Sequence, residues 1–260
     1  MTITSGQMTS ESGHWYHRDG RPAYRIVGKN GVERDTTLRD ARQLNLVPSV
    51  TTITACAAAP GLERWKQEQV LLAALTLPRM EGELEHVWVR RVWVDSHEQA
   101  LKAAQRGTEI HGAIERHLRG ETVEPALQPW VDAAMAQVDT CFGKQSWSPE
   151  KSFAHPLGYG GKVDLHSTSN RVVVDFKTKD GPLSDVKVYD THHMQLAAYA
   201  RGLWDHTSDE VRRSVVAAVI FVRRDKPEAD TRLLSDADLD SGWQQFYHLL
   251  RYWQAKTGHR

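Results

Sequence analysis

The stretch "RVVVDFKTK" (residues 171–179) decides the fold, because it reads as a β-strand with one apolar and one charged face. Successive side chains of a strand point to opposite faces, so Val174 and Phe176 share one face while Asp175 and Lys177 share the other. The first face can enter a hydrophobic core. The second presents a carboxylate beside an ammonium group, and other parts of the chain must explain that pair.

The composition is that of a globular protein. The chain has 260 residues, of which 40% are hydrophobic, enough for one large domain with an ordinary core. No run approaches the roughly 18 uninterrupted apolar residues of a membrane span. The start, "MTITSGQMTSESGH", has neither a secretory apolar core nor an Arg-rich amphipathic pattern. We therefore expect a cytoplasmic protein without membrane association, and the Ala- and Arg-rich composition favours a bacterial or phage-infected cell.

The cysteines and charges exclude several classes of site. Cys56 and Cys141 are the only cysteines, which excludes a disulfide framework and a four-cysteine zinc or iron–sulfur site. Any metal must therefore bind to oxygen and nitrogen. With 33 basic and 33 acidic residues the net charge is zero, so the overall charge makes no case for nucleic acid, although a local basic groove remains open. No Gly-x-x-x-x-Gly-Lys-Ser/Thr loop is present, so we expect no nucleotide cofactor.

The first half of the chain reads as a hairpin followed by helices. The turn signal Asn30-Gly31 predicts a hairpin in "AYRIVGKNGVERDTTL", and we expect the first third to be peripheral. Residues 83–119 read as helical. Within them His111 falls on the apolar stripe and should point inward.

The second half reads as strands and helices in alternation. "EKSFAH", "YGGKVDLH" and "RVVVDFKTK" read as strands, "THHMQLAAYARGLW" as a helix and the β-branched run "SVVAAVIFV" as another strand. A last helix begins at the N-cap Ser235 and presents Trp243, Phe246, Leu250 and Trp253 on one side. This pattern predicts one α/β domain.

Two of these strands form a hairpin that brings carboxylates together. If paired positions sum to 339, Leu165 faces Val174 and Asp164 faces Asp175. Side chains opposite each other lie roughly 4.5–5.5 Å apart at their β-carbons, where like charges repel. A divalent cation would remove that repulsion, and oxygen ligands favour Mg²⁺ or Mn²⁺.

The lysines of the hairpin are harder to place. The register sets Lys162 against Lys177, which is unfavourable unless an anion lies between them or a bulge shifts one strand. Lys177 could contact an anion under attack. An ordinary exposed hairpin whose polar face happens to carry Asp and Lys is the alternative.

Four motifs in order are similar to those of RecB-type nucleases of the PD-(D/E)XK superfamily. They are "RGTEIHGAIE", "GYGGKVDLH", "VVVDFKTK" and "HMQLAAYA". The segments "PSVTTI" and "LERWKQ" and the C-terminal part resemble the mitochondrial genome maintenance exonucleases and their phage and bacterial relatives. The likeness covers roughly residues 48–256.

The resemblance implies a fold and an activity. The fold would be α/β, with a restriction-endonuclease-like core, a mixed central β-sheet flanked by helices, and N-terminal helical additions. Residues 1–260 would form a single nuclease domain, divided into an N-terminal extension with a hairpin (1–47), a helical wall with the histidine motif (48–120), and a catalytic core with the C-terminal helix (147–260). The activity would be that of a Mg²⁺- or Mn²⁺-dependent DNA exonuclease that hydrolyses phosphodiester bonds and prefers single strands with free ends.

The resemblance also assigns roles to residues. His111, Asp164 and Asp175 would bind the metal together with the main-chain carbonyl of Phe176, and Lys177 would assist the attacking water. Asp164, Asp175 and Lys177 would thus be the catalytic set.

Further residues are candidates for supporting roles. Contacts to DNA are expected from Gln195, Tyr199, Lys179, Trp88, Arg90, Arg91 and Trp93. Aromatic and arginine side chains together can stack bases and hold phosphates, but helix packing explains the two tryptophans equally well. An outer contact to the metal site is expected from Glu115, Glu150 or His155, with an ordinary structural role as the alternative for each.

Departures from the family pattern leave alternatives open. Val163 stands where the superfamily name implies proline, and the lack of four cysteines excludes the iron–sulfur branch. Segment 83–100 is longer than its counterpart in the family. A structure-specific endonuclease of the same fold and a non-catalytic DNA-binding module both remain alternatives. Replication or recombination proteins are conceivable partners.

Overall fold

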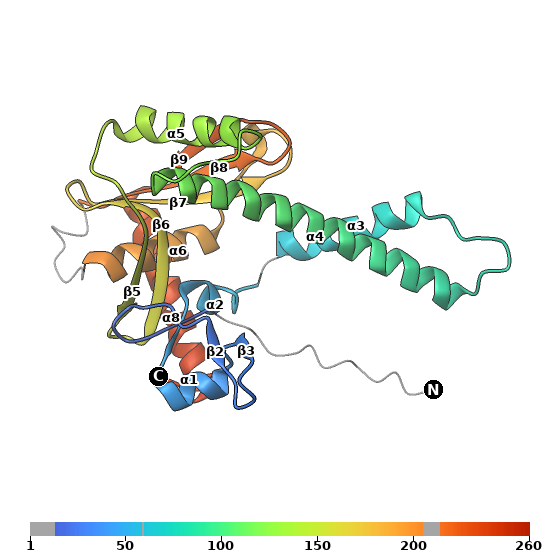
Figure 1. Ribbon diagram of the computed structural model, residues 1–260, viewed down its shortest axis with the longest axis horizontal. Coiled ribbons are helices and arrows are strands. Elements are labelled where there is room, and N and C mark those ends of the chain that lie inside the picture. Colours follow the sequence, from blue (N-terminus) through green and yellow to red (C-terminus); the bar gives the residue numbers. More distant parts are fainter. Residues whose placement is uncertain (1–13, 59, 205–213) are drawn as a thin grey trace.

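The fold is built on a five-stranded mixed sheet. A computed structural model describes residues 14–58, 60–204 and 214–260. In spatial order the strands are β5 (Ser148–His155), β6 (Tyr159–Ser167), β7 (Val172–Lys179), β8 (Val216–Arg223) and β9 (Ala229–Leu233). β7 and β8 are parallel, and the other neighbouring strands are antiparallel. The predicted α/β fold with a mixed central sheet flanked by helices is confirmed (Figure 1).

Helices cover both faces of the sheet (Figure 1). One face carries α4 (Glu85–Leu118) and α5 (Gln128–Phe142), and the other carries α6 (Asp190–Trp204) and α8 (Asp236–Thr257). The helix α6 belongs to the long crossover that joins the parallel strands β7 and β8. The predicted N-cap of the last helix is confirmed, since the Ser235 side chain accepts a hydrogen bond from the Asp238 amide.

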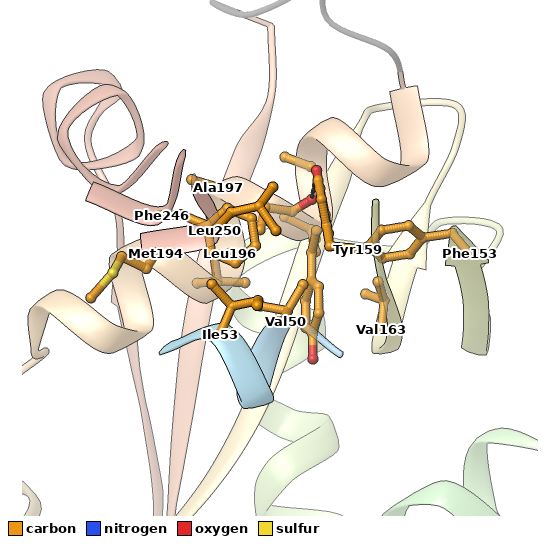
Figure 2. Close-up of a cluster of buried hydrophobic side chains, with 14 of the residues drawn as sticks. Val50, Ile53, Phe153, Tyr159, Val163, Met194, Leu196, Ala197, Phe246 and Leu250 are labelled. Carbon is orange, nitrogen blue, oxygen red and sulfur yellow. Dashed lines mark hydrogen bonds between the residues drawn. The ribbon is translucent and has the colours of Figure 1, made fainter. Parts of the chain in front are cut away.

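The strand β7 divides the hydrophobic core in two, as its alternating sequence predicts. Val173 belongs to the cluster under α6 and α8, which includes Phe246 and is shown in part in Figure 2. Val174 and Phe176 belong to the cluster under α4 and α5, which includes Ile114. On the face of β7 that carries Val173, the next side chains along the strand are Asp175 and Lys177, and these mark the candidate site.

The strand β6 bends at Asp164. Leu165 pairs with Val174, as predicted. Among the described residues, the β6–β7 pairing ends at Leu165. Val163 packs in the α6–α8 cluster whereas Leu165 packs in the α4–α5 cluster, because the strand bends between them. The predicted register, in which paired positions sum to 339, therefore does not extend to Asp164 with Asp175 or to Val163 with Phe176. The two strands separate at Asp164, which leaves room for polar side chains between them.

The N-terminal segment is part of the core, so the expectation of a peripheral first third is wrong. Its elements are β1 (Trp15–Tyr16), β2 (Arg25–Val27), β3 (Glu33–Asp35), α1 (Leu38–Leu44), β4 (Val47–Pro48) and α2 (Val50–Thr54). The predicted β2–β3 hairpin is confirmed. Trp15 and Ile53 pack in the α6–α8 cluster. Tyr16 can approach the sheet because Gly160 has no side chain; a Cβ there would lie 2.9 Å from the Tyr16 Cβ.

Two helices form an arm that projects from the body (Figure 1). The helix α3 (Pro60–Thr76) packs against the N-terminal half of α4, and the 34 residues of α4 confirm the helix predicted over 83–119. Leu72 and Leu75 on α3 are exposed. A short 3₁₀ turn, η1 (Leu183–Asp185), precedes α6. Within the described ranges, no helix is long and apolar enough to cross a membrane.

Candidate active site

A histidine from a helix meets an aspartate where β6 and β7 separate. The His111 Nε2 donates a hydrogen bond to Asp164 Oδ2 over 2.9 Å, and the Phe176 amide donates to the same oxygen over 2.9 Å. The helix α4 lies close to β7 here because residue 107 is glycine; a Cβ at Gly107 would lie 2.6 Å from Thr178 Oγ1. Asp164 thus joins α4, β6 and β7 at one point.

The second aspartate is held on the neighbouring strand. Asp175 is 2% exposed, and its Oδ2 lies 2.6 Å from Lys177 Nζ. Its Oδ1 accepts a hydrogen bond of 2.8 Å from Gln195 Nε2 on α6, and the same amide group donates to the Tyr199 hydroxyl over 2.9 Å. Gln195 and Tyr199 are one turn apart, so both reach the site from one face of α6. The structure therefore brings Gln195 and Tyr199 to the second aspartate.

Lys162 and Lys177 each pair with a carboxylate. The predicted placement of Lys162 opposite Lys177 therefore does not occur. Lys177 pairs with Asp175, and Lys162 forms an ion pair with Glu150 on β5. The reason is the bend in β6, which removes Lys162 from the β7 ladder. In the β5–β6 ladder Pro149 pairs with Leu165 and Lys151 with Val163, so Glu150 between them lies across from Asp164.

Burial and charge perturb these groups strongly. Burial raises the pKa of Asp175 to about 6, against the opposing attraction of Lys177. The negative charge of Asp164 raises the pKa of His111 to about 9 despite burial. Burial alone would raise the pKa of Asp164, but the His111 charge outweighs it and the pKa is lowered. Perturbed groups clustered at one point are typical of functional sites.

A further group of ligand atoms surrounds the imidazole. His111, Glu115 and Glu150 each offer one ligand atom, and these atoms lie within 4.8 Å of one another. Glu115 also pairs with Arg119 over 2.6 Å. Two of the three residues expected at the edge of a metal site are thus beside His111.

The third such residue lies elsewhere. His155 stands at the far end of β5, where its Nδ1 accepts a hydrogen bond from the Leu157 amide and its ring stacks on Tyr159 at 4.8 Å. Five residues of extended strand, about 17 Å, separate it from Glu150. The structure does not bring His155 to the carboxylates.

A basic group lies at the end of β7. Lys179 Nζ lies 5.5 Å from the centre of the Tyr189 ring, and the Arg224 amide donates to the Lys179 carbonyl over 3.0 Å. Burial, then the charges of Arg224 and Lys177, lower the pKa of Lys179. Sequence reasoning missed Arg224 and Tyr189. Arg224 could have been found, because it directly follows the strand parallel to β7, and side chains beyond parallel strands gather at one edge.

The four arm residues expected to contact DNA have different environments. Trp88 Nε1 donates to the Leu77 carbonyl over 2.7 Å, and Arg91 binds Glu83 at 2.9 Å, so both side chains hold the connection between α3 and α4. Trp93 is exposed, and its ring lies 4.4 Å from that of His97. Arg90 and Arg91 line a cavity of about 500 Å³ together with Leu77, Val87, Val94, Asp95 and Glu98.

Comparison with known proteins gives two faint structural likenesses and no sequence match. No protein-family model matches it, and no curated protein matches it by sequence. Among solved structures it is similar to a protein from Eubacterium rectale described as a "Putative exonuclease", with a TM-score of 0.41 and 13% identity over 60% of this chain and 69% of the other. It is also similar to the protein SSO0001, with a TM-score of 0.25 and 13% identity over 48% of this chain and 61% of the other. Both TM-scores are below 0.5, so any functional assignment rests on the site itself.

Proposed function

We propose that the chain is a Mg²⁺- or Mn²⁺-dependent deoxyribonuclease that hydrolyses phosphodiester bonds of single-stranded DNA from a free end. One observation supports the proposal: His111 on α4 contacts Asp164 on β6, and Asp175 on the neighbouring strand β7 is 2% exposed and ion-paired with Lys177. A purely structural ion pair between Asp175 and Lys177 would not require Asp164 and His111 nearby. Burying two carboxylates close together is unfavourable, so their presence calls for a reason.

The donor set fits a hard divalent cation. Two carboxylates, one imidazole and a main-chain carbonyl match the preferences of Mg²⁺ and Mn²⁺, and no thiolate lies among them. His111, Asp164, Asp175 and the carbonyl of Phe176 would hold the ion. A bound ion would neutralise charge on the scissile phosphate and lower the pKa of the attacking water. The raised pKa of His111 predicts that binding releases a proton, since a ligating imidazole must be neutral.

The chain's own side chains then position the reactants. Lys177 is kept protonated, because Asp175 and Asp164 raise its pKa more than burial lowers it. It is therefore suited to orient the water and the phosphate by charge. Gln195 fixes one oxygen of Asp175 and so leaves the other to face Lys177. Tyr199 is held through the same amide group.

Two features support a single strand as substrate. Lys179 lies two residues beyond Lys177 on β7 and could contact a phosphate of the backbone, next to Arg224, whose guanidinium is ion-paired with Asp180. On α4, Trp93 and His111 are 18 residues apart, which is five full turns and about 27 Å, so they lie on the same side of the helix. An exposed tryptophan there could stack an unpaired base.

The proposal is tested by digesting end-labelled linear, circular and duplex DNA with Mg²⁺, Mn²⁺ or chelator. We expect linear single strands to be degraded to 5′-phosphorylated products with either metal, and circles and chelated reactions to stay intact. Lys177→Met should abolish degradation, whereas Lys151→Met, an exposed lysine on β5, should leave it unchanged. Cleaved circles would indicate an endonuclease, and binding without cleavage would indicate a non-catalytic module.

A further inference from the structure

We propose that His192 and Lys179 form a binding site for one phosphate of the DNA backbone, next to the phosphate that Lys177 faces. The inference deepens the proposed function and rests on it. It assigns to His192 the role of an uncharged hydrogen-bond donor to DNA. It also predicts a pattern of DNA binding that can be measured without metal and without cleavage.

The strand β7 and the helix α6 bring the two side chains to one place. Lys177 and Lys179 are two residues apart on β7, so both lie on the face of the sheet that α6 covers. His192 belongs to the first turn of α6 and precedes Gln195 by three residues, so both side chains lie on one side of the helix. The ring centres of His192 and Phe221 lie 5.7 Å apart, and Phe221 is the partner of Lys177 in the β7–β8 ladder. His192 is thus placed beside the end of β7.

One nitrogen of the His192 ring has a partner in the chain and the other has none. The residue is 8% exposed, and its Nδ1 accepts a hydrogen bond of 3.1 Å from the Tyr189 amide. A nitrogen that accepts carries no proton, so in the neutral ring the proton is on Nε2. Within the described part of the chain, no group accepts a hydrogen bond from this Nε2. Because an unsatisfied donor in a buried side chain is costly, Nε2 is suited to a ligand.

The surroundings of the ring keep it uncharged. Burial lowers the pKa of His192 to about 3, and the positive charges of Lys177 and Lys179 contribute to that shift. The effect of both lysines on the ring agrees with its place beside them. At neutral pH the ring is therefore neutral, and it offers a hydrogen bond from Nε2 without adding a third positive charge.

Lys179 is a cation without a carboxylate partner. Its side chain is partly buried, it forms no ion pair within the described ranges, and its ammonium group lies 5.5 Å from the centre of the Tyr189 ring. Burial, then the charges of Arg224 and Lys177, lower its pKa. A phosphate would stabilise the charged ammonium, because it brings a negative charge among these cations. An ammonium group and a neutral donor at one place are the kinds of group that bind phosphates of DNA.

The spacing fits two successive phosphates of one strand. Two residues of extended strand, about 7 Å, separate Lys177 from Lys179. That separation is close to the length of one nucleotide in an extended backbone. With the scissile phosphate at Lys177, the next phosphate would lie at Lys179 and His192. The pair would then fix the position of the strand relative to the carboxylates.

The alternative is that His192 only binds the Tyr189 amide through Nδ1. Two substitutions separate this alternative from the proposal, because each keeps the function of one ring nitrogen. The oxygen of asparagine can take the place of Nδ1 and accept from the Tyr189 amide, but its side chain is too short to donate from the position of Nε2. Glutamine places its amide group near the position of Nε2 and loses the acceptor at Nδ1. The proposal predicts weak DNA binding only for His192→Asn.

The test is binding of a fluorescent oligothymidylate with hydroxyl ends to the full chain in chelator, measured by anisotropy over a series of salt concentrations. We expect His192→Asn to bind about tenfold more weakly at every salt concentration with an unchanged salt dependence, since no charge is removed. His192→Gln should stay within about twofold of the wild type. Lys179→Met should bind more weakly and lose about 0.7 from the salt slope. The matched control is His248→Gln, an exposed histidine of α8, which should bind as the wild type does.

Proton–nitrogen correlation spectra of the wild-type imidazole give a second measurement, which decides if melting curves show that His192→Asn is unfolded. They should show the proton on Nε2 and a shift of the Nε2 resonance when oligothymidylate binds. Unchanged binding by His192→Asn, equal weakening in His192→Gln, or an Nε2 resonance that DNA leaves in place would each overturn the inference. Degradation of linear strands in Mn²⁺ alongside such a result would leave the proposed function standing. The expected binding pattern without any degradation would reject the function instead.

Discussion

Replacing Asp175 by asparagine should stabilise the metal-free protein while abolishing its activity. The carboxylate is 2% exposed and shares its surroundings with Asp164, so folding places negative charge where water cannot solvate it. Asparagine has almost the same shape and keeps an oxygen that can accept the hydrogen bond from Gln195. The substitution therefore removes the buried charge with little change in packing.

The size of the effect follows from the pKa of Asp175. Burial raises it from 3.8 to about 6, so the folded state binds the proton more tightly than the unfolded state. Well below pH 3.8 the carboxyl is protonated in both states and costs no stability. As the pH rises from 3.8 to 6 the loss of unfolding free energy grows, and above pH 6 it reaches its full value. The difference between the two values corresponds to at most about 3 kcal/mol. We expect Asp175→Asn to gain that free energy of unfolding at pH 7.5 and about 1 kcal/mol at pH 4.5.

Urea unfolding followed by circular dichroism, in chelator at both pH values, measures this gain. The control is Asp139→Asn on the exposed side of α5, which should stay within about 0.5 kcal/mol of the wild type. A variant less stable than the wild type at pH 7.5 would contradict the reasoning, because Asp175 would then be stabilised by Lys177 more than burial destabilises it. A gain equal at both pH values would exclude titration of Asp175 as its cause.

Three further substitutions test separate parts of the account. Gly202→Ala should lower the free energy of unfolding by about 1–3 kcal/mol, seen as a lower urea midpoint, because its Cβ would lie 1.9 Å from Phe153 Cε2; an unchanged midpoint would contradict this packing. Gln195→Leu should weaken metal binding about 10- to 100-fold by calorimetry, since Asp175 loses the group that orients it, and unaltered affinity would argue against that support. Lys179→Ala should reduce the salt dependence of single-strand binding by about 0.7 in slope, and an unaltered slope would remove it from the DNA path.

The register of the central hairpin was predictable because it depends on a local pattern. Alternating apolar residues in β6 and β7 can be buried in only one pairing, and Leu165 with Val174 follows from it. The approach of His111 to Asp164 was also expected, although from the family resemblance and not from geometry. What the pattern could not show was the bend at Asp164, because it arises from Val163 and Leu165 packing in different clusters.

Contacts between distant segments account for the other misses. The burial of Trp15 depends on α8, more than 200 residues later, and no local pattern in β1 reveals it. The place of Glu150 depends on a left-handed backbone in β5 and on Lys162 leaving the β7 ladder. Its sequence neighbours suggest only an edge strand. The surroundings of a single charged residue such as Glu150 become known only from the tertiary structure, which shows which residues it contacts.

The most direct test of the central claim is the initial rate at which a 5′-labelled linear single strand is degraded in Mn²⁺ by Asp164→Asn, measured beside the wild type and Asp139→Asn. Asp164 is the residue through which α4, β6 and β7 meet. We predict a loss of at least about a hundredfold for Asp164→Asn and an unchanged rate for the control. A rate for Asp164→Asn equal to that of the wild type would contradict the assignment of this site.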